Sequence, residues 1–359
     1  MIPFFKNHTI LSKKNVSFED NELLKNFNSY LLNKSCTQAL ELAVLSLNLK
    51  QNDEIIIPSY SFVSLGNAIH NFGYRPVFVD CDGDTMNIQA DAIESAISPK
   101  TKAVIAINYS GVGCDYDRIV PLCKKYGLYL IEDNAHGIMA SYKNIPLGSF
   151  GDLATFSFDH LKMISCYEGG ALLVNNQDLS DNYSIVSEFG TNRKDFLEKK
   201  TNFYQWMFKG TNAKLAEPLK NILDIQLSYA KETKVVFKNK WEKYHSALKD
   251  AEDKGYLKRM VIPDYCDHNG YMYWLKTRTA DERSSLMSYL LKNGIQCAFH
   301  YSPLHTSKYG KKVGVFRGID KNTTIGSKCL IRLPHFYELS NDEQDYIIEK
   351  IYDFYFIKG

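Results

Sequence analysis

Lys162 lies where a lysine is hard to solvate, in the stretch FSFDHLKMISCYEGG that runs from Phe156 to Gly170. The aromatic residues before it indicate the end of a short buried strand, and the two glycines after it indicate a turn into the apolar strand ALLV. A lysine held away from water favours its neutral amine, which is a nucleophile. Such an amine can form a Schiff base with an aldehyde. The sequence therefore makes Lys162 the first candidate for covalent chemistry.

Three other groups suit the remaining parts of a cofactor that carries an aldehyde. Asp133 is the second of two acids that end the apolar strand LIED, and ligands bind at such strand ends in open α/β sheets. Ser35, Cys36 and Thr37 precede an apolar helix whose N-terminus could bind a phosphate. Phe62 follows the strand DEIIIPS and could stack on a flat ring. Each group also has a purely structural explanation, as a turn cap, a helix N-cap or a core aromatic residue.

The order of these groups along one α/β pattern favours the functional interpretation. Lys162 would bind an aldehyde, Asp133 would keep a ring nitrogen protonated, Phe62 would lie on the ring, and the residues before the helix would bind a phosphate. Together these four requirements describe pyridoxal phosphate.

Composition excludes several classes of protein. The chain has 359 residues, of which 45% are hydrophobic and 23% charged, and its net charge of +2 argues against a nucleic-acid binder with a broad basic face. None of the eight cysteines forms a C-x-x-C pair, so we expect no metal site and a reducing compartment. Because no signal peptide or membrane span is evident, a cytoplasmic location is expected.

Helical and strand patterns alternate from about residue 35 to residue 175, which predicts a parallel sheet covered on both faces. Further on, a long helical stretch is expected at about 215–253, followed by short strands, among them 259–263 and 295–301, and helices. Ser340 and Glu343 have the spacing of a capping box. We predict a large α/β cofactor-binding domain at 1–234 and a smaller α+β domain at 235–359. The strands predicted in the first part are 53–59, 75–82, 101–111 and 128–133, and the helices are 36–49, 61–73, 88–97 and 115–127.

Several motifs resemble the DegT/DnrJ/StrS family of sugar aminotransferases. IEDNAHG followed by FSFDHLKMISCYEGGALLV carries the resemblance, and IIPSYSFVS, FVDCDGDTMNI, EFGTNRKDF, FHYSPLH and LIRLPHFYELS resemble segments of the family in the same order. Within the family the chain is most similar to a branch that works on dTDP-4-keto-6-deoxyglucose. The resemblance implies the type I fold of PLP-dependent aminotransferases, like aspartate aminotransferase, with pyridoxal 5'-phosphate (PLP) as cofactor.

The resemblance also implies roles for individual residues. Lys162 would hold the cofactor covalently, Asp133 would pair with its pyridine nitrogen and Phe62 would stack on its ring. Around the phosphate it places Ser35, Cys36, Thr37 and Ser157. His136 would lie beside the ring hydroxyl, and Asn212 and Lys214 would reach the neighbouring subunit's site. Tyr301 and His305 would line the sugar pocket.

The chain departs from the family pattern at several positions. Asp159 replaces a usual His, with His160 next to it, and Leu161 replaces a usual Thr. Residues 1–65 contain no glycine, so the loop ahead of the phosphate-binding helix is expected to be short. The segment GTNAKLAEP departs from the family's Asn-x-Arg-Met form.

The expected reaction moves an amino group from L-glutamate to the C4 ketone of a nucleotide-linked 6-deoxyhexose, for a surface polysaccharide such as lipopolysaccharide O-antigen. A homodimer with shared active sites is expected. Three alternatives stay open: amination at C3, a relative that removes a hydroxyl, in which a His replaces the lysine, and a PLP-binding relative without activity.

Overall fold

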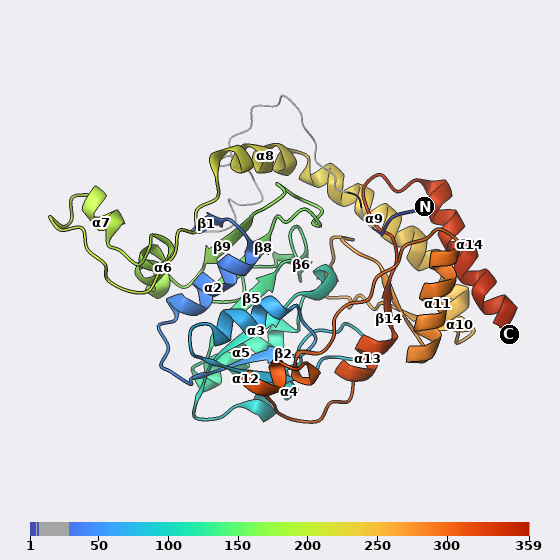
Figure 1. The fold of residues 1–359 in the computed structure, drawn as a ribbon, viewed down its shortest axis with the longest axis horizontal. Coiled ribbons are helices and arrows are strands. Elements are labelled where there is room, and N and C mark those ends of the chain that lie inside the picture. Colours follow the sequence, from blue (N-terminus) through green and yellow to red (C-terminus); the bar gives the residue numbers. More distant parts are fainter. Residues whose placement is uncertain (5, 7–28, 359) are drawn as a thin grey trace.

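The computed structural model describes residues 1–4, 6 and 29–358. The loop that the sequence predicts to be short falls mostly within residues 7–28, outside the described part. Most of the described chain is arranged around one large mixed sheet with helices on its faces (Figure 1).

The large sheet confirms the predicted, mainly parallel core. Its strand order is β1-β9-β8-β5-β4-β2-β3-β13. The strands from β8 to β13 in this order pair in parallel, whereas β9 pairs antiparallel with both β8 and β1. The strands are β1 (Tyr30–Asn33), β2 (Glu54–Pro58), β3 (Arg75–Val79), β4 (Thr101–Ile107), β5 (Tyr129–Asn134), β8 (Leu153–Ser157), β9 (Gly170–Val174) and β13 (Val315–Phe316).

Each face of this sheet packs into its own hydrophobic core. Along β2, Ile55 and Ile57 belong to one core and Ile56 to the other, as the alternation of side chains in a strand requires. Helices α2 (Cys36–Ser46) and α3 (Val63–His70) contribute to the first core, and α4 (Ala90–Ala96) and α5 (Tyr116–Tyr126) to the second. The prediction of a sheet covered on both faces is therefore confirmed.

The C-terminal part contains an antiparallel sheet with the order β10-β12-β14. Its strands are β10 (Leu257–Arg259), β12 (Trp274–Thr277) and β14 (Leu330–Arg332), and its helices include α11 (Ala280–Lys292), α12 (Gly310–Val313), α13 (Thr323–Cys329) and α14 (Asn341–Lys358). At the start of α14, the Ser340 hydroxyl accepts the Glu343 N–H at 3.1 Å and the Glu343 carboxylate accepts the Ser340 N–H at 2.9 Å. This reciprocal pair confirms the predicted capping box.

The predicted helical stretch at 215–253 is confirmed, with short breaks, whereas two strand predictions in this part were wrong. The helical stretch at 215–253 is divided into α8 (Glu217–Ser228), α9 (Ala230–Ala247) and α10 (Lys249–Asp253). The strand predicted at 259–263 ends at Arg259, and 295–301 forms only the isolated bridges Ile2–Ile295 and Ala298–Arg332. Pro263 and the absence of a continuous partner strand limit pairing there.

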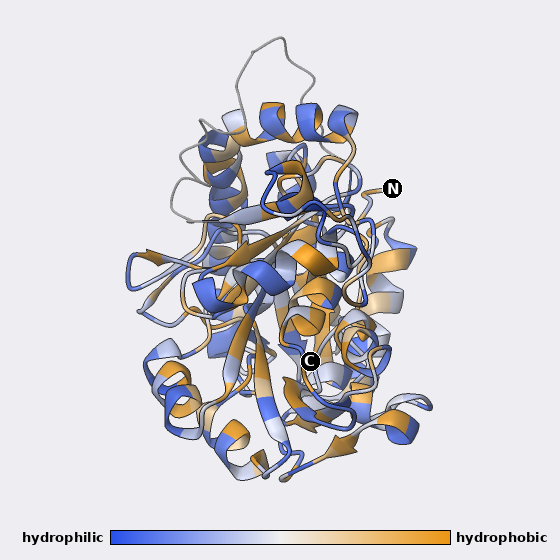
Figure 2. Cartoon of the chain, turned by 90° about the vertical axis from the view of Figure 1, so that its left-hand side faces the viewer, coloured by the Kyte–Doolittle hydropathy of each residue, from blue (hydrophilic) through white to orange (hydrophobic). Residues whose placement is uncertain are grey.

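Segments that are distant in sequence also pair across the predicted domains. Strand β13 adds to β3, and β11 (Cys266–Asp267) adds to β6 (Ser141–Tyr142) in a small sheet with β7 (Ile145–Pro146). The boundary at 234/235 falls within α9 and stays a prediction. Figure 2 shows helical ribbons that change between hydrophobic and hydrophilic residues along their turns, as is typical of helices that cover a core with one face.

The segment around α7 (Arg193–Leu197) stands out from the body of the molecule, whereas α6 (Ser180–Ser187) packs on α2 (Figure 1). Among the described helices, none combines the length and the apolar character needed to cross a membrane.

Candidate active site

A cavity of about 380 Å³ lies where β2, β4, β5 and β8 end and the C-terminal part covers the sheet edge. The carboxyl edge of a parallel sheet is the usual ligand site in this architecture. The cavity brings together most of the residues that the sequence singled out: Ser35, Cys36, Thr37, Phe62, Asp133, His136, Ser157, Lys162 and Tyr301.

Lys162 lies in the connection between β8 and β9, half-buried on the cavity wall. This connection is folded back on itself, because the Phe158 N–H donates to the Gly169 carbonyl at 2.9 Å and the Lys162 N–H donates to the Asp159 carbonyl at 2.9 Å. The Lys162 Nζ lies 5.3 Å from the centroid of the Tyr271 ring. The amine is thus held on the cavity side, less deeply buried than the sequence suggested.

The two acids at the end of β5 have different surroundings. Glu132 faces inward and accepts the N–H groups of a turn, including those of Gly148 at 2.9 Å and Gly151 at 2.8 Å. Asp133 lines the cavity, is 5% exposed, and accepts the Ala135 N–H at 2.9 Å. Glu132 is therefore the acid that caps the turn, and Asp133 remains available to a ligand.

Burial raises the pKa of the Asp133 carboxyl, while the Ala135 N–H and the positive charge of Lys162 act in the opposite direction. Its charged form is therefore incompletely compensated by the protein. A cationic ring N–H placed in the cavity would supply the missing partner, so Asp133 fits the pyridine nitrogen of PLP.

The N-terminus of α2 forms the end of the cavity that suits a phosphate. Ser35 is the N-cap, and its hydroxyl accepts the Gln38 N–H at 3.1 Å. A Cβ on Gly170 would come within 2.4 Å of the Cys36 nitrogen, so only glycine lets the start of β9 lie against this helix end. The capping interpretation of Ser35 is therefore confirmed, and the unpaired N–H groups of the first helical turn still border the cavity.

The other residues near this end have distinct environments. Cys36 is buried, and its thiol donates to the Thr155 hydroxyl at 3.6 Å. Thr37 is exposed at the cavity, and Ser157 presents its hydroxyl from the end of β8. Hydroxyls and backbone N–H groups are the donors that a phosphate requires.

Phe62 is not a core residue, since it is 57% exposed on the cavity wall as the N-cap of α3. Its ring centroid lies 6.1 Å from that of Tyr301, which comes from the C-terminal part. The cavity therefore has an aromatic wall built from both parts of the chain.

Sequence reasoning assigned no role to three side chains of the cavity: Tyr271, His300 and Arg332. His300 contacts Arg332 Nη1 through Nε2, and its Nδ1 lies 3.2 Å from the Tyr109 hydroxyl. Burial, followed by the charges of Arg332 and Lys162, lowers the pKa of His300. A neutral His300 can accept from Arg332. The segments FHYSPLH and LIRLPHFYELS contained His300 and Arg332, but only the fold brings these two residues and Tyr271 to the cavity of Lys162.

His136, the residue predicted beside the ring hydroxyl, lines the cavity with Nδ1 3.3 Å from the Ser110 N–H that donates to it. Burial and the positive charge of Lys162 lower its pKa. A neutral imidazole leaves Nε2–H as a donor toward the cavity.

Three predicted residues do not line the cavity. Lys214 pairs with Glu188, and the Asn212 carbonyl accepts from the Gln38 side chain at 3.4 Å. His305 bonds to Ser59 and Asp320 beneath the wall. The roles of these residues toward cofactor or sugar therefore stay predictions.

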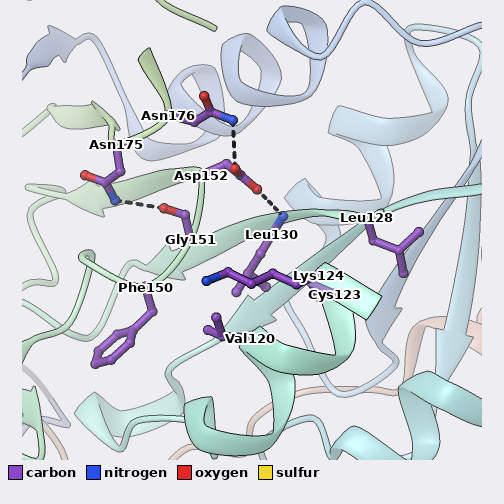
Figure 3. Close-up of a pocket in the computed structure, with 10 residues that line it drawn as sticks. All are labelled: Val120, Cys123, Lys124, Leu128, Leu130, Phe150, Gly151, Asp152, Asn175 and Asn176. Atoms are coloured by element: carbon purple, nitrogen blue, oxygen red, sulfur yellow. Dashed lines mark hydrogen bonds between the residues drawn. The ribbon is translucent and has the colours of Figure 1, made fainter. Parts of the chain in front are cut away.

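A second hollow, of about 240 Å³, lies at the opposite edge of the sheet, between α5 and the starts of β5 and β8 (Figure 3). Asp152 accepts the Leu130 N–H at 2.8 Å and the Asn176 amide at 2.9 Å, and the Asn175 amide donates to the Gly151 carbonyl at 2.9 Å. These polar groups hold loops together. Within the described part of the chain, no three His, Cys, Asp or Glu side chains are grouped to hold a metal ion.

The mixed sheet, the antiparallel C-terminal domain and the lysine at the carboxyl edge define a type I PLP-dependent aminotransferase. The chain belongs to the DegT/DnrJ/EryC1/StrS aminotransferase family, whose model matches residues 14–352. It is accordingly a sugar aminotransferase, and its cofactor is pyridoxal 5'-phosphate.

Two curated relatives and one solved structure illustrate what the chain is similar to, and the solved structure shows the fold alone. GDP-perosamine synthase of Escherichia coli O157:H7 is 31% identical over 89% of this chain and 84% of its own length. The spore coat polysaccharide biosynthesis protein SpsC of Bacillus subtilis is 29% identical over 90% of this chain and 84% of its own. The crystal structure of the aminotransferase TlmJ from Streptoalloteichus hindustanus superposes with a TM-score of 0.84 at 24% identity, covering 93% of this chain and 88% of TlmJ.

Proposed function

We propose that this protein transfers an amino group from L-glutamate to the C4 ketone of a nucleotide-linked 6-deoxyhexose, with dTDP-4-keto-6-deoxyglucose as the expected acceptor. The observation that carries the proposal is that one cavity is lined by both parts of the chain. Lys162 and Asp133 lie in it together with Arg332 and with the aromatic wall of Phe62 and Tyr301. The product would serve the synthesis of a surface polysaccharide.

When bound, PLP supplies an aldehyde that takes up the amino group and a ring that withdraws electrons. Lys162 Nζ would hold the aldehyde carbon and, once released by the donor amine, would carry a proton between carbon atoms as general base and acid. Asp133 would accept the pyridine N–H, Phe62 would lie on the ring, and the first turn of α2 would bind the phosphate.

Arg332 is suited to a carboxylate of the amino donor. Its guanidinium lines the cavity, where its Nε has no hydrogen-bond partner, and the Phe4 ring packs 4.5 Å from it. No carboxylate of the described residues pairs with it. Arginine binds carboxylates in a planar, bidentate geometry. A dicarboxylic donor such as L-glutamate would supply this missing counter-charge.

The aromatic wall is suited to a sugar ring. Beside Phe62, the rings of Tyr301 and the neighbouring Tyr271 line the cavity as flat, partly apolar surfaces, and the names of the relatives support a nucleotide sugar. One relative is a synthase of a GDP-linked sugar, and another belongs to polysaccharide biosynthesis. Both names favour an activated sugar over a free one as acceptor.

Transfer can be tested in two half-reactions. Addition of L-glutamate should bleach the absorbance of bound PLP. Addition of dTDP- or GDP-linked 4-keto-6-deoxy sugars should restore it, with the amino product identified by mass, and 3-keto sugars are tested beside them. Restoration by a 3-keto sugar alone would favour C3 amination, loss of a hydroxyl would favour the dehydrating alternative, and no bleaching by any amino acid would favour a non-catalytic relative.

The segment around α7 supports a homodimer with shared sites. It exposes large apolar side chains, with Phe203 at 73% and Trp206 at 80% exposure, and it stands out from the body of the molecule (Figure 1). Exposed aromatic residues are enriched at interfaces. A second copy of the chain would cover them and bring Asn212 and Lys214 to the neighbouring cavity.

Subunit mixing tests this assembly. An inactive Lys162→Ala protein mixed with an inactive Asn212→Ala/Lys214→Ala protein should regain part of its activity, because one site of a mixed dimer is intact. A monomeric mass by light scattering, or no rescue after proven subunit exchange, would contradict shared sites.

A further inference from the structure

His305, Ser59 and Asp320 form a hydrogen-bonded chain outside the cavity. The His305 Nδ1 lies 2.6 Å from the Ser59 hydroxyl, and its Nε2 lies 3.2 Å from the Asp320 carboxylate. Asp320 in turn accepts the Thr324 N–H at 3.0 Å. Three segments meet in this chain: the loop after β2, the turn η4 (Leu304–Thr306) and the loop before α13.

The arrangement fixes the tautomer of His305. Asp320 can only accept, so Nε2 carries the proton of a neutral ring and Nδ1 accepts from the Ser59 hydroxyl. The Ser59 oxygen accepts the His305 backbone N–H at 3.1 Å, and the Ser59 carbonyl accepts the Leu304 N–H at 2.9 Å. Ser59 is 0% exposed, so water cannot replace a lost bond there.

The same two segments are also joined at the cavity end. The Tyr60 hydroxyl donates to the His300 carbonyl. The segment 300–305 is therefore bonded at both ends to the loop 59–62. Tyr301 lies between the two attachments, and its ring centroid is 6.1 Å from that of Phe62, which follows the attached residues of the loop 59–62.

This geometry points to a function for His305 that is different from contact with the sugar. We propose that His305 is a positioning residue, which holds Tyr301 at its place beside Phe62 in the aromatic wall and so shapes the side of the cavity that receives the acceptor sugar. The proposal rests on the transferase function argued above. Ser59 and Asp320 are the partners through which it acts.

The proposal predicts that substitutions of His305 affect only one of the two half-reactions. Among the described residues, the hydrogen bonds and the ion pair of His305 go to Ser59 and Asp320 and not to Lys162, Asp133 or the N-terminus of α2, and the backbone of Arg332 is held by β14 pairing with β12. Cofactor binding and reaction with L-glutamate should therefore be insensitive to His305. Reaction with the larger acceptor, which needs the wall, should be sensitive.

Two isosteric variants identify the bond that matters. An asparagine amide reaches the place of Nδ1 and can still bond to Ser59, whereas a glutamine amide reaches the place of Nε2 and can bond only to Asp320. His305→Gln should raise the acceptor KM about tenfold, the equivalent of one lost hydrogen bond between buried groups. His305→Asn should stay within about threefold of the wild type. Both should keep the PLP absorbance and the rate of bleaching by L-glutamate.

Ser59→Ala removes the same side-chain bond from the other partner, together with the bond that the Ser59 oxygen accepts from the His305 backbone N–H, and is the second variant should His305→Gln fold poorly. It should raise the acceptor KM at least as much as His305→Gln, and the double variant Ser59→Ala/His305→Gln should be no worse than Ser59→Ala alone, because the side-chain bond is already lost there. Thermal unfolding of each PLP-loaded variant serves as the control for general destabilisation.

The outcomes distinguish this inference from the proposed function. If the wild type bleaches with L-glutamate but reacts with no keto sugar, the proposed acceptor is wrong. If the wild type reacts while His305→Gln and Ser59→Ala keep its acceptor KM, or if Asn and Gln at 305 behave alike, His305 does not position the wall. An equal loss in both half-reactions would likewise contradict the proposal.

Discussion

Replacement of Asp133 by asparagine should separate catalysis from stability. The substitution keeps the shape of the side chain and removes its charge. In the structure this carboxylate is 5% exposed, and burial raises its pKa, with Ala135 N–H and Lys162 opposing the shift. The buried negative charge of Asp133 therefore lowers the stability of the cofactor-free protein at neutral pH, and we expect it to become favourable when a cationic ring N–H lies beside it.

The sign of the stability effect follows from this pKa. Because the carboxyl binds its proton more tightly in the folded than in the unfolded protein, its contribution to stability is most favourable in acid and declines as the pH rises above the usual carboxyl pKa. Asp133→Asn removes the carboxyl group and therefore removes this loss of stability with rising pH. The PLP-free variant should therefore be as stable as the wild type at pH 7, or more stable, with the difference vanishing in acid.

Catalysis should change in the opposite direction. Removal of one charged partner from a preorganised site typically costs about 100-fold in rate, or about 2.7 kcal/mol of transition-state stabilisation. The stabilisation of Asp133→Asn by added PLP should also be smaller than that of the wild type. The rate of bleaching by L-glutamate and thermal unfolding with and without PLP measure both effects.

Two results would refute the reasoning. Near wild-type turnover of Asp133→Asn would mean that the carboxylate does not face the ring nitrogen. A large loss of stability in the PLP-free variant would mean that Asp133, like Glu132, is a structural cap.

Other substitutions test separate parts of the site. Lys162→Ala should abolish the absorbance of bound PLP and all turnover while circular dichroism stays unchanged, and an active variant would contradict the assignment of this lysine. Gly170→Ala should weaken PLP binding at least about tenfold in a titration, because its Cβ would lie 2.4 Å from the Cys36 nitrogen and displace the helix end. Glu54→Gln should lower the free energy of unfolding by about 2 kcal/mol at pH 7. The nearly buried Glu54 carboxylate lies 2.6 Å from Arg317 Nη2, and its replacement by a neutral amide leaves the arginine without a counter-charge. Burial raises the pKa of Glu54, but the hydrogen bonds from Arg317 and Ser98 bring it below its usual value. Its stabilisation is therefore present above the usual carboxyl pKa and should disappear in urea titrations as the pH falls below about 4.

The sequence alone predicted most of the residues that we propose for the cofactor. Strands that are apolar throughout and alternate with helices require a covered parallel sheet, and its carboxyl edge brings Asp133, Phe62 and Lys162 together whatever the details of packing. The Glu-Gly-Gly after Lys162 was informative for a steric reason, since Gly170 must lie against the start of α2. Such local requirements are visible in a single chain.

Only the tertiary structure showed the further cavity residues that we propose for the substrates. His300 and Arg332 come from segments about 170 and about 200 residues beyond Asp133, and no local pattern distinguishes a cavity residue from a core or surface residue there. His305 shows the limit most clearly: its segment resembled the family, but its side chain bonds to Ser59 and Asp320 beneath the wall. Periodicity fixes which face of an element is buried, whereas the identity of the partners across an interface depends on long-range packing that a single sequence does not encode in any local pattern.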